Sequence, residues 1–294
     1  MAYVLSCCTT CDMPEEFFAR RDIHYICFHF NLNGKDMYDD LGHSISFKDF
    51  YQAMRDGAST GTSQVSVGEY EEYFDKFLSQ GLDVFHLTLS SGISGTLQSA
   101  LVAQKTMQEK YPDRKIVVMD SLCAAAGYGL LMDHLADLRD AGKSFDEVVA
   151  WAEEHRLNIH TWFFTEDLTY LIRGGRVSKA AGAIGSLLKL CPLMNVDYKG
   201  KLVSRAKIRT KKKCMRAAVD TMEQHADGGA DYSGKVFIGH ADCLDDAQEL
   251  AAMVAERFPK SQQPYMINYI GTTIGSHTGP GLLVLDFDGD KRVD

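Results

Sequence analysis

The 294-residue sequence has no apolar run close to the ~20 residues that a membrane-spanning helix requires. Its longest apolar stretch, residues 122–132, contains two glycines and is long enough only for a buried helix. The N-terminus lacks the basic and apolar regions of a signal peptide. We therefore expect a cytoplasmic protein without stable membrane insertion, whose eight cysteines are reduced thiols.

A net positive charge is also absent, since 31 Lys and Arg oppose 40 Asp and Glu and give −9. This balance argues against a nucleic-acid-binding protein, because a phosphate backbone requires a basic face. The sequence contains neither the Gly-x-x-x-x-Gly-Lys-Ser/Thr of a P-loop nor a Gly-x-Gly-x-x-Gly after a strand. We expect no cofactor and no metal ion.

The first half of the chain alternates strand and helix patterns. Ser66 and Glu69 form a capping box, and five apolar residues follow at helical spacing. A second capping box begins at Ser144. The predicted strands are residues 3–6, 83–89 and 115–119, and the predicted helices are 66–80, 95–110, 122–139 and 144–154. This order is typical of an α/β, Rossmann-like domain with a parallel sheet and helices on both faces.

The second half has a different order, which favours an α+β domain with a mostly antiparallel sheet. Residues 193–196 and 202–204 flank a turn and predict a hairpin. The other predicted strands are 161–165, 236–239, 265–270 and 282–287, and the predicted helices are a short one ending at Gly174, then 180–190, 211–225 and 245–258. We expect two domains, residues 1–158 and 159–294.

The charge is unevenly distributed. Between Leu168 and Arg216, thirteen Lys and Arg oppose one acid, Asp197, which makes this basic segment +12. The remaining 18 basic and 39 acidic residues make the rest of the chain −21. Such a run is often only a solvated face, but it also suits a docking surface for an anionic group or partner.

Two segments rich in hydroxyl groups precede predicted helices. Residues 60–64 read as a loop, and residues 90–96 (Ser-Ser-Gly-Ile-Ser-Gly-Thr) join a strand to a helix. Free backbone N–H groups at the positive end of a helix favour a carboxylate or a phosphate. Ser and Thr are also common helix caps and turn formers, so both interpretations stay open.

His277 lies among three glycines and a proline, which predicts a tight loop around a binding or proton-handling imidazole, or else a core histidine. Arg173 and Arg176 flank two glycines that end a short helix, and their guanidinium groups match carboxylate and phosphate oxygens. Ser94 follows a strand and precedes a helix, as in a hydrolase, although the Gly-x-Ser-x-Gly spacing is missing. A Ser94–His277–aspartate triad, acting as a hydrolase or acyltransferase, is an alternative.

Cys8 and Cys11 form a CxxC after a short strand, with Cys7 before it. Such thiols suit a redox pair or half of a metal site. A second CxxC is absent, which favours small, partly buried thiols. A redox or metal module at these three cysteines is the second alternative.

Several short motifs, in this order along the chain, resemble the DegV family of bacterial fatty-acid-binding proteins, the acyl carriers of fatty acid kinase. The resemblance covers nearly the whole chain. The motifs are Leu89-Ser-Ser-Gly-Ile-Ser-Gly-Thr96, Asp120-Ser121, Tyr170-Leu-Ile-Arg-Gly-Gly-Arg-Val177, Gly185-Ser-Leu-Leu188, Lys207-Ile-Arg-Thr210 and His277-Thr-Gly-Pro-Gly281.

The resemblance implies a non-catalytic, monomeric carrier with a long-chain fatty acid, such as palmitate, buried between its two domains. It implies that Thr62 and Ser94 hold the carboxylate and that a kinase partner phosphorylates it. It places further residues near the carboxylate end, namely Ser63, Gly95, Thr96 and His277, with Arg173, Arg176 and Arg205 facing the phosphoryl group or the partner. The chain departs from the family at residues 7–12, where Cys-Cys-Thr-Thr-Cys-Asp replaces an Asp-Ser-Thr-like sequence, and at His29, where a Pro-Leu pair is common.

Overall fold

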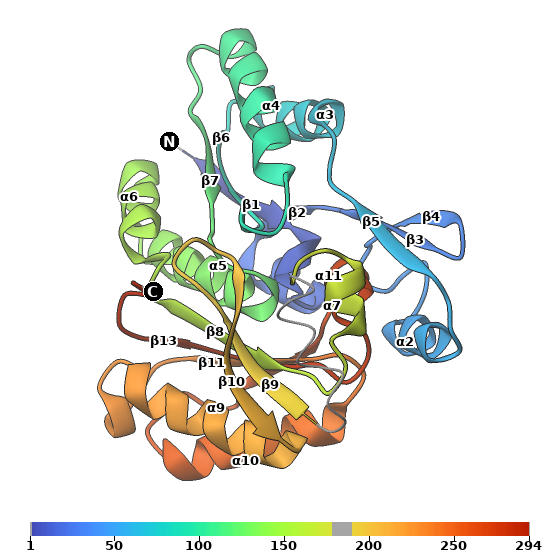
Figure 1. Ribbon diagram of the computed structural model, residues 1–294. Coiled ribbons are helices and arrows are strands. Elements are labelled where there is room, and N and C mark those ends of the chain that lie inside the picture. The colour runs from blue at the N-terminus through green and yellow to red at the C-terminus, as the bar shows by residue number, and fades with distance from the viewer. Residues whose placement is uncertain (1, 178–189, 294) are drawn as a thin grey trace.

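The computed structural model describes residues 2–177 and 190–293, whose strands form three sheets (Figure 1). Sheet A is fully parallel, as the sequence predicts, in the order β2-β1-β6-β7. Its strands are β1 (Tyr3–Cys8), β2 (Ile23–Ile26), β6 (Asp83–Thr88) and β7 (Ile116–Asp120). Every residue of β6 is buried, because this strand lies inside the sheet and has helices on both faces.

The helices around sheet A follow from their caps and apolar faces. In α3 (Val67–Leu78) the Ser66 side chain accepts a hydrogen bond from the Glu69 N–H and the Glu69 carboxylate accepts one from the Ser66 N–H, which confirms the capping box. α3 and α4 (Thr96–Lys110) pack on one face. α5 (Ala125–Asp140) and α6 (Phe145–His155) pack on the other face, where the second capping box, at Ser144, is also confirmed.

Sheet C is mostly antiparallel, which confirms the mixed α/β architecture. Its strand order is β10-β9-β8-β13-β11-β12, and β11–β12 is the parallel pair. The strands are β8 (Ile159–Phe164), β9 (Leu190–Val196), β10 (Leu202–Arg209), β11 (Val236–His240), β12 (Met266–Tyr269) and β13 (Leu283–Asp288). One face is covered by α9 (Lys211–His225) and α10 (Leu244–Arg257). The opposite face contributes to the cavity described below.

The small sheet B is absent from the prediction. Its antiparallel order is β4-β3-β5, and α2 packs against it. The elements are β3 (His29–Leu32), β4 (Lys35–Tyr38), α2 (Phe47–Arg55) and β5 (Thr60–Ser63). The expected loop at residues 60–64 is wrong, because Thr60–Ser63 pairs along its length with β3. These three hydroxyl residues and one glycine lack the alternation of apolar and polar residues that marks a strand in a sequence. Their extended conformation depends on pairing with β3.

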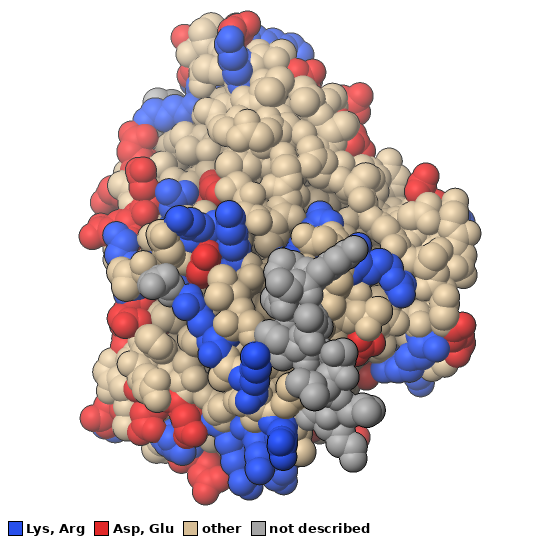
Figure 2. All heavy atoms as spheres, viewed as in Figure 1, with Lys and Arg blue, Asp and Glu red and all other residues tan. Residues whose placement is uncertain are grey.

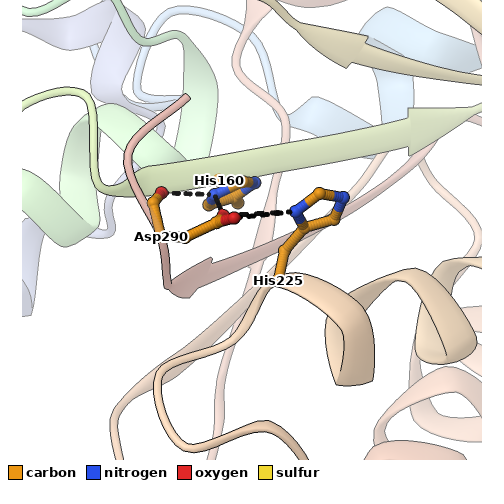
Figure 3. A group of neighbouring side chains, drawn as sticks. All are labelled: His160, His225 and Asp290. Carbon is orange, nitrogen blue, oxygen red and sulfur yellow. Dashed lines mark hydrogen bonds and ion pairs between the residues drawn. The ribbon is translucent and has the colours of Figure 1, made fainter. Parts of the chain in front are cut away.

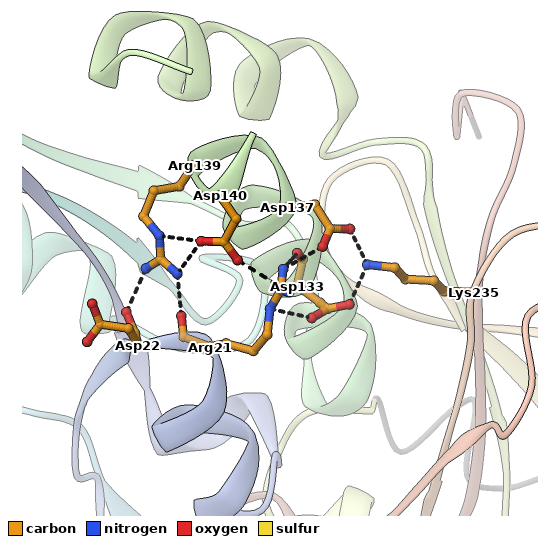
Figure 4. Close-up of polar contacts among 7 residues, drawn as sticks. All are labelled: Arg21, Asp22, Asp133, Asp137, Arg139, Asp140 and Lys235. Atoms are coloured by element: carbon orange, nitrogen blue, oxygen red, sulfur yellow. Dashed lines mark hydrogen bonds and ion pairs between the residues drawn. The ribbon is translucent and has the colours of Figure 1, made fainter. Parts of the chain in front are cut away.

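Helix α5 lies between sheets A and C (Figure 1). A Cβ on Gly127 would lie 2.1 Å from Thr161 Oγ1 and 2.5 Å from Asp286 Oδ1, so only glycine permits this approach to sheet C. Asp133 and Asp137 of α5 both bind Lys235, which comes just before β11 (Figure 4). Because α5 contacts both sheets, the boundary between residues 158 and 159 stays a prediction.

Ion pairs also join α5 to α1 (Glu15–Arg21). Arg21 Nε lies 3.1 Å from Asp133 Oδ1, and Arg21 Nη2 lies 2.5 Å from Asp137 Oδ1 (Figure 4). The remaining short elements are η1 (Thr9–Cys11), α7 (Thr169–Arg173), η2 (Gly229–Asp231) and α11 (Thr272–Thr278). Within the described ranges, no helix has both the length and the apolarity to cross a bilayer.

The basic segment lies mainly on the edge strand β10 and the start of α9. On β10 the side chains of Arg205, Lys207 and Arg209 alternate outward and are exposed, whereas those between them are half-buried. Figure 2 shows Lys and Arg gathered on the face that carries β10 and α9. Lys179, Lys189, the motif at 185–188 and residues 180–189 of the predicted helix lie outside the described residues, whereas Leu190, its last predicted residue, begins β9.

Candidate functional site

A cavity lies between the two halves of the chain and holds about 940 Å³ of empty space, its open mouth included. Its concave lining of apolar side chains with a few polar groups suits a small-molecule ligand. Residues before the predicted domain boundary that line it are Phe28, Thr62, Gln64, Leu89, Ile93, Ser94, Gly95, Ala124 and Ala125. Residues after it are Thr161, Phe163, Leu171, Arg176, Val196, Leu202, Thr273, Ile274, His277, Thr278, Leu282 and Val284.

Thr62 and His277 meet in the wall of the cavity. Thr62 Oγ1 lies 2.7 Å from His277 Nε2, although 215 positions separate the two residues. Thr62 is on β5, and His277 is in the last turn of the seven-residue helix α11. The loop expected around His277 is therefore wrong. The glycines after it end the helix instead, and Gly279 and Gly281 have φ of +73° and +87°, a region that favours glycine.

Ser94 enters the cavity from the turn between β6 and α4. Its Oγ accepts a hydrogen bond of 3.3 Å from the Thr96 N–H, at the first residue of the helix. This turn fits tightly against the β9–β10 hairpin, since a Cβ on Gly92 would lie 2.4 Å from the Gly200 carbonyl oxygen. The Ser90 hydroxyl donates to that same oxygen at 2.8 Å. Sheet C thus helps to hold the turn that carries Ser94.

The other hydroxyl residues of the predicted site are placed differently. Gly95 lines the cavity, and a Cβ there would lie 2.5 Å from Gln64 Oε1, so the glycine leaves room for that side chain. Thr96 is fully buried, and its Oγ1 lies 2.8 Å from the hydroxyl of Tyr70. Ser63 is exposed on β5. Neither Thr96 nor Ser63 is among the residues that line the cavity.

Of the three predicted arginines, Arg176 lies at the cavity. Its Nε donates to the Ile93 carbonyl at 3.2 Å and its Nη1 to the Gly174 carbonyl at 2.6 Å, so it ties the end of α7 to the Ser94 turn. Arg173 is exposed, and its guanidinium lies 5.5 Å from the ring centre of Tyr170. Arg205, also exposed, donates to Asn195 Oδ1 at 2.9 Å, and neither lines the cavity.

The His277 imidazole is held in a low-dielectric position. Burial, with the nearby charge of Arg176, lowers the pKa of His277 to about 4, so the ring is neutral at neutral pH. Its Nδ1 packs on Gly174, where a Cβ would lie 2.3 Å away. Among the described residues this nitrogen has no hydrogen-bond partner. A catalytic triad needs a carboxylate there and a serine at Nε2, where Thr62 lies instead.

The N-terminal thiols are packed into the interior. Cys7, Cys8 and Cys11 are fully buried, and the Sγ atoms of Cys7 and Cys11 lie 3.8 Å apart. Burial raises the pKa of Cys8 to about 12 and also raises the pKa of Cys7 well above its usual range. Reactive or metal-binding cysteines need the thiolate, so this environment disfavours the thiol alternative. His29, the other position where the chain departs from the family, lies on β3, and its Nε2 is 2.8 Å from Glu69 Oε1.

Most of the cavity wall comes from apolar residues that no motif marks. β8 contributes Phe163, β13 contributes Val284, Leu282 comes directly before β13, and Leu202 comes from β10. In sheet C the even-numbered residues of β13 lie opposite the odd-numbered residues of β8, and both sets point to the face that borders the cavity. The only signal in the sequence is alternation within a strand, which marks one face as buried but not what it faces.

Near this wall, Thr161 of β8 and Asp286 of β13 form a buried polar pair. They are cross-strand partners under α5, and their exposed fractions are 3% and 0%. Thr161 lines the cavity. Burial raises the pKa of Asp286 well above its usual range, which the Thr161 hydroxyl and the charge of Arg292 only partly offset. Burial therefore favours the neutral, protonated form of Asp286.

This protonation predicts a specific pH dependence. In the unfolded chain Asp286 ionises near its ordinary pKa of about 3.9, whereas in the folded chain it retains its proton to a higher pH. The stability contributed by the neutral acid is thus progressively lost as pH rises above about 4. We expect Asp286→Asn to stabilise the protein, relative to the original chain, more at pH 8 than at pH 5. Urea unfolding of both proteins at the two pH values measures the difference.

The exposed Asp113→Asn serves as the control for this pH effect and should show no such change. A gain from Asp286→Asn that is equal at pH 5 and pH 8 would mean that Asp286 is ionised in the folded protein.

Comparison with known proteins places the chain in a family. The model of a family described as "Uncharacterised protein, DegV family" matches residues 9–287. A DegV domain-containing protein of Clostridium perfringens (strain 13 / Type A) is 35% identical over 290 residues, covering 99% of this chain and 98% of that protein.

Solved structures share the whole fold. A DegV family protein from Thermus thermophilus, described by its fatty acid binding, has a TM-score of 0.86 at 25% identity and covers 98% of this chain and 100% of its own. DegV, a fatty acid binding protein from Bacillus subtilis, has a TM-score of 0.83 at 26% identity, with coverages of 99% and 100%. Sequence, fold and the matched length lead to one conclusion: the chain belongs to the DegV family.

Proposed function

We propose that this chain binds one long-chain fatty acid, such as palmitate, in the cavity between its two halves. The observation that carries the proposal is the lining, which combines two kinds of group: the paired Thr62 hydroxyl and His277 imidazole with the Ser94 hydroxyl, and apolar side chains such as Phe163, Leu282 and Val284. A fatty acid has the same division. The relatives from Thermus thermophilus and Bacillus subtilis, both described as binding fatty acids, support the assignment.

The acyl chain supplies most of the affinity. Burying a methylene group contributes about 0.8 kcal/mol, so a sixteen-carbon acid gains roughly 10 kcal/mol before the costs of binding. Hydrogen bonds to the carboxylate add about 1.5–3 kcal/mol each before desolvation is subtracted. The apolar wall therefore sets affinity, and the hydroxyl groups set the orientation of the ligand.

The carboxylate is oriented by hydroxyl donors that the surrounding side chains position. A neutral His277 with its proton on Nε2 donates to Thr62 Oγ1 and leaves the Thr62 hydroxyl to donate to the ligand. We assign this tautomer from the chemistry, because Nδ1 has no partner among the described residues. Ser94 supplies the second hydroxyl, and the N-terminus of α4, which starts at Thr96, favours the negative charge.

The same arrangement suits a carrier that presents the carboxylate to a kinase without catalysing the transfer itself. The carboxylate end lies where Arg176 joins the two halves, and the exposed basic residues of β10 and α9 provide a surface for an anionic partner. This proposal rests on the resemblance to acyl carriers of fatty acid kinase. It assigns Arg173 and Arg205 to the partner-facing surface, with the protein acting as a cytoplasmic monomer without a cofactor.

The hydroxyl pair is tested by Ser94→Ala. We expect palmitate binding to weaken about tenfold, because one charge-assisted hydrogen bond, worth about 1.4 kcal/mol net, is lost while the acyl wall is intact. Isothermal titration calorimetry with delipidated protein measures the change.

Ser91→Ala is the matched control for Ser94→Ala. Ser91 lies in the same turn but is exposed and does not line the cavity. Equal affinities of the two variants would remove Ser94 from the carboxylate site.

A further inference from the structure

Two histidines and an aspartate from separate elements meet outside the cavity (Figure 3). His160 is the second residue of β8, His225 is the last residue of α9, and Asp290 lies two residues after β13. None of the three lines the fatty-acid cavity. The cluster is therefore a separate site from the proposed fatty-acid cavity.

The potential ligand atoms are spaced as a small metal ion requires. His160 Nε2 lies 3.0 Å from Asp290 Oδ1, and His225 Nδ1 lies 3.2 Å from the same oxygen. All three ligand atoms lie within 4.8 Å of one another. Zn²⁺ binds imidazole nitrogen and carboxylate oxygen at about 2.0–2.2 Å, so tetrahedral ligand atoms lie about 3.3 Å apart. Two of the three separations are already close to this value.

Ring stacking positions the two imidazoles, and a backbone hydrogen bond positions Asp290. The His160 ring stacks on Phe287, with ring centres 5.2 Å apart, and on His225, with ring centres 5.1 Å apart. The Asp290 N–H donates to the His225 carbonyl at 2.9 Å. A Cβ on the intervening Gly289 would lie 2.2 Å from that carbonyl oxygen, so glycine lets the C-terminal segment approach α9. Ligand positions fixed in this way lower the cost of ordering them around an ion.

The ligand types select among metals. Two imidazoles and one carboxylate are a common set for Zn²⁺, whereas Mg²⁺ and Ca²⁺ prefer oxygen ligands throughout. The Asp290 side chain is 62% exposed and that of His225 36%, which leaves a fourth position open to water. We propose that His160, His225 and Asp290 bind one Zn²⁺ ion, with water as the fourth ligand, and so link β8, α9 and the C-terminal segment.

Binding requires a change of tautomer at His160. Its Nε2 lies 2.8 Å from the Asp290 carbonyl oxygen, so without metal the proton sits on Nε2 and is donated to Asp290. With Zn²⁺ on Nε2 the proton resides on Nδ1, which is buried and has no partner among the described residues. This unsatisfied N–H lowers the affinity, and we expect a dissociation constant in the micromolar range rather than that of a four-ligand structural site.

Calorimetric titration of EDTA-treated, dialysed protein with ZnCl₂ tests the site. We expect one Zn²⁺ per chain and a higher melting temperature with Zn²⁺ than without it. His225→Gln and Asp290→Asn each remove a ligand from the exposed side of the cluster and should weaken binding at least tenfold. The control is His43→Gln, which replaces an exposed histidine that pairs with Glu15 instead.

Two results would overturn the proposal. One is the absence of stoichiometric Zn²⁺ binding by the original chain. The other is that the His225→Gln and Asp290→Asn variants bind Zn²⁺ as strongly as the His43→Gln control does. Circular dichroism of the metal-free variants separates loss of a ligand from loss of the fold. Palmitate binding should be the same in all of them, because the cluster does not contact the cavity.

Discussion

Replacing Arg292 with alanine is expected to lower the free energy of unfolding by about 3–5 kcal/mol, the range for breaking a buried charged network. The residue is 5% exposed, close to the C-terminus. Its guanidinium donates to five backbone carbonyl groups at 2.9–3.3 Å, those of Leu122, Arg156, Leu157, Val196 and Asp197.

These five carbonyls belong to parts of the chain that are far apart in sequence. Residue 122 follows β7 of sheet A, residues 156 and 157 join α6 to β8, and residues 196 and 197 end β9. Arg292 thus connects the two halves of the chain. One of its acceptors, Val196, lines the cavity, so this connection lies close to the ligand site. Without the guanidinium, several buried carbonyl oxygens lose their donor, and each unsatisfied group costs about 1–3 kcal/mol.

Thermal unfolding followed by circular dichroism measures the loss, and a decrease in melting temperature of about 10 °C is expected. Lys291→Ala, at the exposed neighbouring position, is the control and should change little. Arg292→Lys keeps the charge but has fewer donors, so its stability should fall between the two. If Arg292→Ala were as stable as Lys291→Ala, the C-terminal segment would not be holding the halves together.

Filling the cavity should abolish most of the ligand affinity. Val284 lies on β13, is 2% exposed and lines the cavity beside Phe163 and Leu282. Phenylalanine is well tolerated in strands, and here its ring would occupy space otherwise available to about four methylene groups. At about 0.8 kcal/mol each, their loss amounts to roughly 3 kcal/mol, or a 100-fold weaker complex.

Two measurements check this expectation. Mass spectrometry of the ligand extracted from purified protein should find a long-chain fatty acid, near one per chain, in the original protein and little in Val284→Phe. Calorimetry then gives the loss of palmitate affinity. Val102→Phe makes the same replacement at an exposed position of α4 and should bind normally. Undiminished binding by Val284→Phe would place the acyl chain elsewhere.

Most of the secondary structure could be predicted from local signals. The capping boxes at Ser66 and Ser144, with apolar residues at helical spacing, were sufficient for α3 and α6. The helix predicted at residues 211–225 is α9, with the same bounds. Such elements are predictable because their termini and their buried faces are encoded within one or two turns of chain.

The site was less accessible to sequence reasoning. The sequence predicts a loop at Thr62, because β5 has no apolar pattern of its own and forms through its pairing with β3. His277 was expected in a loop because glycine and proline dominate its surroundings, yet those residues end a short helix. The cluster of His160, His225 and Asp290 has no motif spacing, since 130 positions separate its first and last members.

The sequence alone determined most of the helices and strands outside residues 9–64, the parallel character of the first half and the family, because each depends on local patterns or short motifs. The tertiary structure decided which of the candidate residues meet. It brought Thr62, Ser94 and His277 to one cavity and left Ser63 and Thr96 away from it. It also turned one face of sheet C into the wall of that cavity. Contacts between residues more than a hundred positions apart arise from how the sheets pack, and no local pattern in the chain records them.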